Sequence, residues 1–215
     1  SGPTRAVAKI YQDAKIPMIS AYANHPDITK TGNFIFRQSF VGTVQGKAGA
    51  KVAVDLLKAK KLSILAVDND FGKSLADSFK QKAELMGAQV ISYDTFAMGE
   101  KEFTPVLTKL KGLNPDLIYI PVYAGEGAQI VRQAKDLGLK NQLLGTEGVD
   151  STLQFLGVAK EMADGVIITT NLNRDSDRKS VKDFIEGFNT AYGHKPDMVA
   201  ASTYDAFNVI FTVIA

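Results

Sequence analysis

The chain has 215 residues, of which 45% are apolar and 22% charged, with a net charge of +2 at neutral pH. This composition is typical of a globular protein with a sizeable core, built as one large or two small domains. Lys and Arg are scattered among Asp and Glu, which argues against a nucleic-acid surface. The absence of cysteine excludes a disulfide framework, a thiol nucleophile and a thiolate metal site.

The predicted elements begin with a helix over 4–14, strands over 17–20 and 34–39, and a helix over 45–59. From about residue 60 to 170, short β-rich runs alternate with helical segments such as the one that carries Phe103, Leu107 and Leu110 on one face. Further strands are predicted over 63–67, 89–93, 117–122, 142–145 and 166–170. This alternation predicts an α/β fold with a parallel sheet and right-handed crossovers. Helices over 180–192 and 200–215 complete the chain.

The motifs of catalysis and of cofactor binding are missing or incomplete. Neither of the two histidines has a second His or Cys at ligand spacing, so we predict no metal site. The pair Gly125-x-Gly127 lacks the third glycine of a dinucleotide-binding turn, and Gly42-x-x-x-Gly46-Lys47 is one residue too short for a phosphate loop. We therefore predict no catalytic residues, no cofactor and no enzyme.

Two acidic residues leave an alternative open. Asp68 and Asp70 directly follow the predicted strand over 63–67, and acidic side chains at the carboxyl end of a parallel strand can hold a metal or a phosphoryl group. The favoured interpretation is a loop that turns the chain and caps the next helix. An enzyme that uses Asp68 or Glu147 is the least favoured reading of the sequence.

A set of short motifs lies in order along nearly the whole chain. The motifs are Ile10-Tyr11-Gln12, residues 16–21, Asn24-x-Pro26-x-Ile28-Thr29, Phe36-Arg37, Val67-x-x-x-Phe71-Gly72, Gly99-Glu100-Lys101-x-Phe103, Leu107-x-x-Leu110-Lys111, Pro115-Asp116, Gly145-x-Glu147-Gly148, Ala163-x-Gly165-Val166 and Tyr204-Asp205-Ala206. No single motif is diagnostic, but the ordered set resembles the type I solute-binding proteins of branched-chain amino-acid import, the leucine/isoleucine/valine-binding family.

The resemblance implies two doubly wound, Rossmann-like lobes with parallel sheets and a ligand cleft between them. Lobe 1 would consist of residues 1–41 and 171–215, and lobe 2 of residues 42–170. Hinges are expected near 41–44 and 169–172. Family members begin with further βα units of lobe 1 that precede Ser1, so we expect lobe 1 to be incomplete at its N-terminal side and further chain at both ends.

The resemblance also implies ligand contacts from lobe 1. Serine at the position of Ser1 contacts the ligand carboxylate in amino-acid-binding members. Ala23 and Asn24 belong to a loop that offers a backbone carbonyl to the ammonium and a backbone amide to the carboxylate. The branched-chain proteins usually have threonine at the position of Asn24, which otherwise reads as a turn residue before Pro26. Tyr22 is a further aromatic side chain that could contact the ligand.

From lobe 2 the resemblance implies three contacts. Phe71 matches an aromatic position that lines the cleft, and Tyr123 and Glu147 match residues that meet the ammonium when the lobes close. Both Tyr123 and Glu147 follow predicted strands, so the residue pattern independently places them at carboxyl ends. The structural alternatives are plain packing for Phe71 and Tyr123, and a solvated loop residue or helix cap for Glu147.

The expected function is the extracytoplasmic solute-binding component of an ABC importer, which closes by hinge motion on an α-amino acid with an apolar or aromatic side chain. The expected location is periplasmic or extracellular, free or lipid-anchored, and a signal peptide is not present in this chain. The expected partners are the small ligand and a membrane permease, with no nucleic acid, and self-association or a separate fragment at the open edge of lobe 1. The alternative is the ligand-sensing domain of a receptor or transcription regulator with the same fold.

Overall fold

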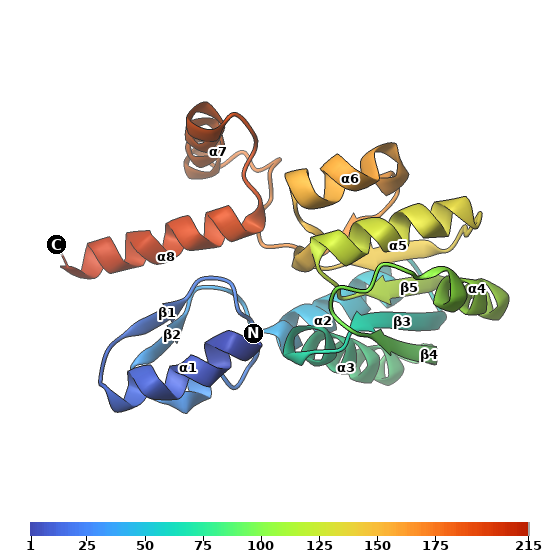
Figure 1. Ribbon diagram of the computed structural model, residues 1–215, viewed down its shortest axis with the longest axis horizontal. Coiled ribbons are helices and arrows are strands. Elements are labelled where there is room, and N and C mark those ends of the chain that lie inside the picture. Colours follow the sequence, from blue (N-terminus) through green and yellow to red (C-terminus); the bar gives the residue numbers. More distant parts are fainter. Residues whose placement is uncertain (215) are drawn as a thin grey trace. The chain divides into compact units, whose positions relative to one another are not determined.

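The computed structural model describes residues 1–214, and Ala215, the predicted last residue of the final helix, lies outside the described residues. The chain divides into two compact units, each coloured along the sequence in Figure 1. Unit 1 consists of Ser1–Val41 and Thr170–Ala215, and unit 2 is Gly42–Thr169. That these units act as the two lobes of a ligand clamp stays a prediction.

Unit 2 is built on a five-stranded sheet in which every neighbouring pair is parallel. Its order is β4 (Gln89–Phe96), β3 (Lys61–Val67), β5 (Leu117–Ile120), β6 (Gln142–Gly145) and β7 (Ile167–Ile168). The predicted α/β fold with a parallel sheet is confirmed. The strand expected over 117–122 ends at Ile120, because Pro121 has no N–H to donate to a neighbouring strand.

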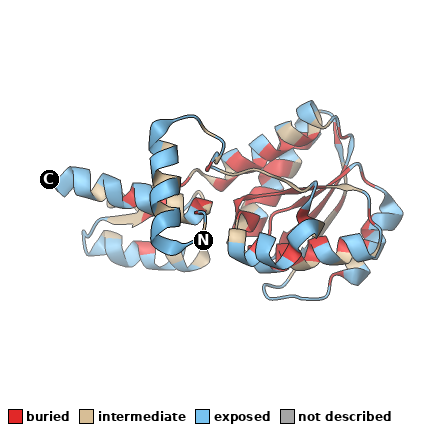
Figure 2. Ribbon diagram, turned by 90° about the horizontal axis from the view of Figure 1, so that it is seen from above, coloured by how far each residue is buried: buried red, intermediate tan, exposed pale blue. Residues whose placement is uncertain are grey.

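Helices cover both faces of this sheet, and alternate residues of its central strand β5 enter two separate hydrophobic clusters. Ile118 and Ile120 pack with α4 (Thr104–Leu113) and α5 (Ala124–Asp136) on one face. Tyr119 packs with α2 (Gly42–Lys51) and α3 (Asp70–Leu85) on the other. Figure 2 shows the resulting concentration of buried residues around the sheet. The remaining helical segments of unit 2 are the π-helical turns Val52–Leu56 and Thr152–Leu156, the short α6 (Gly157–Ala159), and the 3-10 turns Glu147–Val149 and Lys160–Ala163.

The Gly42-x-x-x-Gly46 motif lies within α2 and serves helix packing. A Cβ atom on Gly46 would lie 2.2 Å from the Ser78 Oγ and 2.5 Å from the Leu75 carbonyl oxygen, both in α3. Only glycine allows the two helix backbones to approach so closely. The resemblance of this motif to a phosphate-binding loop therefore follows from helix packing and does not indicate phosphate binding.

Unit 1 contains α1 (Gly2–Asp13), the 3-10 turn Thr29–Thr31, a parallel pair of three-residue strands, α7 (Lys179–Tyr192) and α8 (Met198–Ile214). The strands are β1 (Met18–Ser20) and β2 (Ile35–Arg37), both shorter than predicted. The hydrophobic cluster that the structure describes in this unit has three buried members, Ala8, Ile28 and Ile35.

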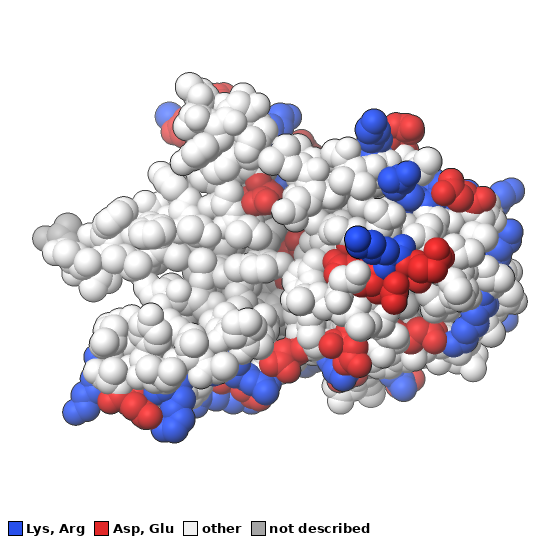
Figure 3. Space-filling model, viewed as in Figure 1, with Lys and Arg blue, Asp and Glu red and all other residues white. Residues whose placement is uncertain are grey.

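Apolar side chains of unit 1 lie largely at its surface. Phe207 and Phe211 of α8 are exposed, and Asp205 is the only charged residue in that helix. In Figure 3 the surface over α8 is almost free of charged groups, whereas Lys and Arg alternate with Asp and Glu over unit 2. No helix within residues 1–214 combines the length and the hydropathy of a membrane span.

Candidate functional site

Three predicted ligand-binding residues of unit 2 follow three adjacent strands of the sheet. Phe71 lies in the first turn of α3, just after β3. Tyr123 precedes α5 and follows β5, and Glu147 begins the 3-10 turn that follows β6. Because β3, β5 and β6 are neighbours and run parallel, all three residues lie beyond the C-terminal ends of these strands. Open α/β sheets bind their ligands at this end of the strands.

Phe71 and Tyr123 form a stacked aromatic pair. Their ring centroids are 4.8 Å apart and their planes differ by 17°. Phe71 is 3% exposed, whereas Tyr123 is half-buried. Packing therefore accounts for Phe71, whose ring stacks against that of Tyr123. Tyr123 presents the accessible part of the pair.

The loop that carries Glu147 packs directly against this pair. A Cβ atom on Gly148 would lie 2.2 Å from the Val122 carbonyl oxygen and 3.0 Å from the edge of the Phe71 ring. The Thr146 hydroxyl caps the turn by accepting from the Gly148 N–H at 3.3 Å. Glycine at position 148 thus lets the backbone next to Glu147 approach Phe71. This contact joins the three predicted residues into one cluster.

Glu147 places a carboxylate in a setting of low solvent exposure, since the residue is 2% exposed. Burial raises the pKa of Tyr123, and the negative charges of Glu126 and Glu147 raise it further. Burial and the charge of Glu147 also keep the pKa of Tyr119 well above its ordinary value. Both phenols are therefore neutral hydrogen-bond donors. The end of the sheet therefore holds a buried carboxylate and, at Tyr123, a half-buried phenol that can donate a hydrogen bond.

In unit 1, Ser1 and Asn24 contact each other. The Ser1 hydroxyl donates to the Asn24 side-chain oxygen at 3.3 Å and accepts from the His25 N–H at the same distance. Asn24 is 1% exposed, so it is a buried part of the loop and not only a turn residue before Pro26. Tyr22 lies in the same loop and is half-buried.

The carbonyl group of Ala23 is already hydrogen-bonded inside unit 1. It accepts from the hydroxyls of Ser20 and Ser39, each at 3.2 Å, and from the Arg37 guanidinium at 3.5 Å. A carbonyl oxygen has two lone pairs. A ligand ammonium that binds this carbonyl, as the predicted role requires, must share it with the serines. The loop's shape therefore depends on side chains that do not themselves belong to the predicted site.

Arg37 organises this loop, although the sequence pattern shows it only as a charged residue at a strand end. Its guanidinium donates to the His25 carbonyl at 2.7 Å and to the Thr29 hydroxyl at 2.8 Å. Burial lowers the pKa of Arg37 from its usual value, but the guanidinium keeps its positive charge at neutral pH. An arginine at the end of a predicted strand was the only signal that the sequence offered for this role.

Asn69 is the second residue that the sequence reasoning missed. Its side-chain oxygen caps α3 by accepting from the N–H groups of Phe71 and Gly72, at 2.9 and 3.1 Å. Its amide nitrogen donates to the Tyr123 hydroxyl at 3.5 Å. Asn69 thus fixes the start of α3 and contacts the aromatic pair. The signal was an asparagine at an N-cap position, directly before an apolar helical stripe.

Asp68 and Asp70, the acidic residues on either side of Asn69, have structural roles at the start of α3. Asp68 forms an ion pair with Lys73, one turn into α3, and Asp70 is the first residue of that helix, where negative charge is favourable. The residue that caps the helix is Asn69 rather than either aspartate. Within residues 1–214, no group of His, Cys, Asp and Glu side chains has the arrangement of a metal site.

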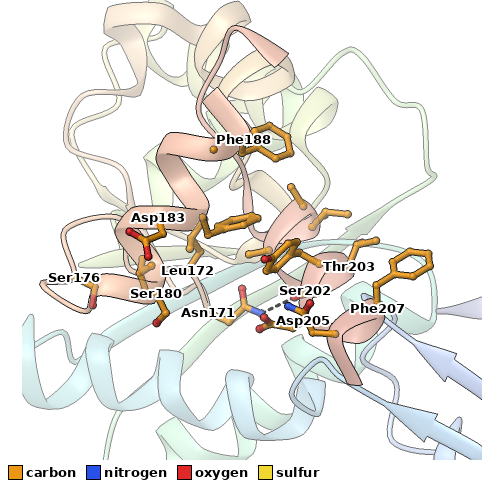
Figure 4. A pocket seen from close by; sticks show the side chains of 18 of the residues that line it. Asn171, Leu172, Ser176, Ser180, Asp183, Phe188, Ser202, Thr203, Asp205 and Phe207 are labelled. Carbon is orange, nitrogen blue, oxygen red and sulfur yellow. Dashed lines mark hydrogen bonds between the residues drawn. The ribbon is translucent and has the colours of Figure 1, made fainter. Parts of the chain in front are cut away.

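A large open cavity lies elsewhere, between α7 and α8 of unit 1, with a volume of about 1420 Å³. Figure 4 shows Phe188 and Phe207 at its sides and the hydrogen bond from the Asn171 side chain to the Ser202 hydroxyl, which is 2.8 Å long. None of the predicted ligand-binding residues lines this cavity. Its lining mixes apolar and aromatic side chains with polar and charged ones.

Comparisons with known proteins agree on one family. A sequence model described as periplasmic binding protein matches residues 1–215. The Leu/Ile/Val-binding protein of Citrobacter freundii is 34% identical over 176 residues, which are 81% of this chain and 48% of that protein. A binding protein of Pseudomonas aeruginosa for leucine, isoleucine, valine, threonine and alanine is 28% identical over 98% of this chain and 56% of its own length. The chain thus spans about half the length of the curated relatives it matches.

Solved structures give the same answer. A leucine-binding protein of Thermotoga maritima superposes with a TM-score of 0.91 at 30% identity, covering 98% of this chain and 60% of that one. A branched-chain amino-acid transporter substrate-binding protein of Streptococcus pneumoniae, in complex with isoleucine, gives 0.90 at 28% identity, with coverages of 98% and 60%. The fold is therefore the type I periplasmic binding fold. The chain belongs to the periplasmic binding protein family, a family of binding proteins rather than enzymes, and is related to the Leu/Ile/Val-binding proteins of ABC transporters.

Proposed function

We propose that this chain is part of an extracytoplasmic solute-binding protein of an ABC importer, and that its solute is an α-amino acid with an apolar or aromatic side chain. The observation that carries the proposal is the cluster of Phe71, Tyr123 and Glu147 at the carboxyl edge of the unit 2 sheet. A carboxylate that is 2% exposed binds an ammonium group more strongly than one in water, because the effective dielectric constant around it is lower. The ammonium group of an amino acid fits this position.

Unit 1 would contribute the second half of the site. The Ser1 hydroxyl, which donates to the Asn24 side chain in this structure, would turn to donate to the ligand carboxylate together with a backbone N–H of the loop that holds Tyr22, Ala23 and Asn24. The Ala23 carbonyl would accept from the ammonium, and Glu147 of unit 2 would bind the same ammonium on closure, so closure would depend on both ends of the ligand. The names of the relatives from Citrobacter freundii and Pseudomonas aeruginosa support this choice of ligand.

The proposed partners follow from the family. Such a protein delivers its solute to a permease in the membrane, from the periplasm or from the cell surface, either free or lipid-anchored.

We further propose that this chain alone associates with a second copy through unit 1, since Tyr204, Phe207 and Phe211 of α8 are exposed. Sedimentation across a range of concentrations tests this proposal, and a monomer at every concentration contradicts it.

An aromatic carboxylic acid is the second candidate for the solute. A solute-binding protein of Rhodopseudomonas palustris in complex with 4-hydroxybenzoate superposes with a TM-score of 0.85 at 26% identity, covering 97% of this chain and 58% of that one. The stacked Phe71–Tyr123 pair could accept an aromatic ring. Such a ligand brings no ammonium to the buried Glu147, which makes it the less favoured choice.

A thermal-shift screen of the full-length protein separates these candidates. Each of the twenty amino acids, 4-hydroxybenzoate, benzoate, urea and a simple sugar is added in large excess. A ligand that binds only the folded state stabilises it by about 2.7 kcal/mol at a hundredfold excess over Kd. A shift with leucine, isoleucine, valine or phenylalanine supports the proposal. A shift with the benzoates alone replaces it with the second candidate, and no shift with either class contradicts both.

A further inference from the structure

Gln45 joins the two places where the chain passes between the units. The chain leaves unit 1 at Val41–Gly42 and returns to it at Thr169–Thr170. Gln45 lies in the first turn of α2, three residues after the first crossing. Its side-chain nitrogen donates to the carbonyl oxygen of Thr169 at 3.0 Å and to the Thr169 hydroxyl at 3.1 Å. Two connecting segments 124 residues apart in sequence are therefore linked by one side chain.

The orientation of the Gln45 amide is fixed by chemistry. The Thr169 carbonyl can only accept a hydrogen bond, so the nitrogen of the amide must face it. The oxygen of the same amide is buried, and no hydrogen-bond partner for it is found among the described residues. Gln45 itself is 4% exposed. An apolar residue of similar size would avoid a buried acceptor without a donor, so stability alone does not explain a glutamine at this position.

The link continues from Thr169 to the proposed ligand site. The Thr169 N–H donates to the Gly145 carbonyl at 3.1 Å, and its hydroxyl lies 3.5 Å from the same oxygen. Gly145 ends β6 and lies two residues before Glu147. The Gln45 amide, Thr169 and Gly145 therefore form a continuous series of hydrogen bonds. It runs from the first connecting segment, through the second, to the loop that carries Glu147.

We propose that Gln45 is a positioning residue that clamps the two connecting segments together, so that unit 1 and unit 2 move about one paired hinge. This rests on the proposed function, in which a ligand is held between the units. With the clamp intact, the ligand-free protein samples a narrow range of arrangements. Without it, the second connection moves independently of the first. A smaller fraction of molecules then has the arrangement that binds ligand.

The test uses full-length protein whose only cysteines are introduced at Lys9 of unit 1 and Gln81 of unit 2, both exposed. Spin labels at these sites report the distribution of distances between the units in the absence of any ligand. Gln45→Leu removes the clamp with little change in size, and Thr169→Val removes only its hydroxyl. We expect the distribution to widen in Gln45→Leu, and to widen less in Thr169→Val. Thr169→Ser keeps the hydroxyl and should behave as the unmodified protein does.

Gln142 provides a matched control. Its side-chain nitrogen also donates to two backbone carbonyls of unit 2, those of Gly165 at 2.6 Å and Leu143 at 3.0 Å. These lie at the opposite end of β6 from Thr169. Gln142→Leu likewise removes a side-chain amide that bonds to the backbone of unit 2, and should leave the distance distribution unchanged. An unchanged distribution in Gln45→Leu, or equal widening in both variants, would overturn the proposal.

A binding measurement adds a second readout. With L-leucine as the probe, Gln45→Leu should raise the apparent Kd by about three- to tenfold, because apparent affinity scales with the fraction of binding-competent molecules. Gln142→Leu should leave the Kd unchanged, and an equal rise in both variants counts against the clamp. If leucine binds neither the unmodified protein nor its variants, the proposed ligand is wrong. The ligand-free distance distributions then still decide whether Gln45 is a clamp.

Discussion

Different interactions stabilise unit 2 and unit 1. Unit 2 has two hydrophobic clusters on the two faces of a five-stranded sheet, and the largest buried side chains, such as Tyr119 and Phe79, stack with their centroids 4.0 Å apart. Unit 1 has a two-stranded sheet and a cluster of three buried residues. Its α7 contains no buried residue among those described. Its loops rely instead on polar contacts such as those of Arg37.

The difference explains where each half of the proposed site obtains its rigidity. In unit 2 the Phe71–Tyr123–Glu147 cluster is an extension of the apolar core, since Phe71 and Tyr123 pack against the cluster that contains Phe79. In unit 1 the loop of Ala23 and Asn24 is shaped by hydrogen bonds. Unit 2 should therefore respond most to changes of volume, and unit 1 to loss of hydrogen-bond donors. Three substitutions with their controls test this contrast, and a fourth tests a hydrogen-bonded carboxylate of unit 2.

The largest effect is expected in the core of unit 2. Phe79→Ala removes a fully buried ring that stacks on Tyr119, and should lower the free energy of unfolding by about 3–5 kcal/mol. Phe211→Ala in unit 1 removes a ring that is 63% exposed, and should change it by less than about 0.5 kcal/mol. Urea denaturation followed by circular dichroism measures both. Similar costs for the two variants would remove the contrast between the units.

The next effect is expected at Arg37. Arg37→Met keeps the apolar stem but leaves the His25 carbonyl and the Thr29 hydroxyl without their donor. The cost should be about 1.5–3 kcal/mol, the range for hydrogen bonds to a charged group. Arg132→Met, at an exposed position of α5, is the control and should cost less than about 0.5 kcal/mol. Hydrogen exchange localises the effect: faster exchange within 23–29 is predicted, and exchange unchanged there would refute the role.

Gly148→Ala should have a comparable or smaller cost, with a larger effect on binding. The added methyl group would lie 2.2 Å from the Val122 carbonyl oxygen, so the loop must move, at about 1–3 kcal/mol. Because that loop carries Glu147, affinity for the solute should fall as well. Gly125→Ala meets nothing within 4 Å and is the matched control. If the Gly148→Ala variant bound the solute as tightly as the unmodified protein, the loop would have no role in the proposed site.

The smallest predicted effect concerns pH. Hydrogen bonds from the backbone N–H groups of Lys61 and Lys60 lower the pKa of Asp116 below its usual value. A carboxyl whose pKa is lower in the folded state stabilises the fold above its unfolded pKa, and this contribution is lost as pH falls through the folded value, below about pH 4. Since Asp116 is exposed, the contribution is at most about 1 kcal/mol. Asp116→Asn should lose less stability than the unmodified protein between pH 5 and pH 3, in parallel acid titrations.

The sequence predicted the fold of unit 2 well because its strands are short apolar runs separated by amphipathic helices, and both signals are local. The helix over 45–59 shows the limit. The α-helical part ends at Lys51, and a π-helical turn follows directly. No local sequence pattern predicts this change. The predicted strands of unit 1 shorten to three residues each, because strand length depends on the neighbours available for pairing.

The site could be predicted only in part. Tyr123 and Glu147 were predicted at carboxyl ends of strands and Phe71 only as an aromatic position of the cleft, and the structure brings Phe71 and Tyr123 into contact next to the loop of Glu147. The supporting roles of Asn69, Arg37 and Gln45 arise from contacts between residues distant in sequence, such as the 54 residues that separate Asn69 from Tyr123. A single sequence shows no sign of these pairings. That the predicted residues of both units bind one ligand stays a proposal.

The most direct test is calorimetric titration of the full-length protein and of its Glu147→Gln variant. The ligands are L-leucine and 4-methylpentanoate, which lacks only the ammonium group. If Glu147 binds that group, the unmodified protein prefers leucine by at least about tenfold, and the preference disappears in Glu147→Gln, since close charge pairs contribute about 1.5 kcal/mol or more. Glu126→Gln, which alters a nearby carboxylate bonded to the Gly99 N–H, should keep the preference. An equal preference for leucine in the unmodified protein and in Glu147→Gln would contradict the account.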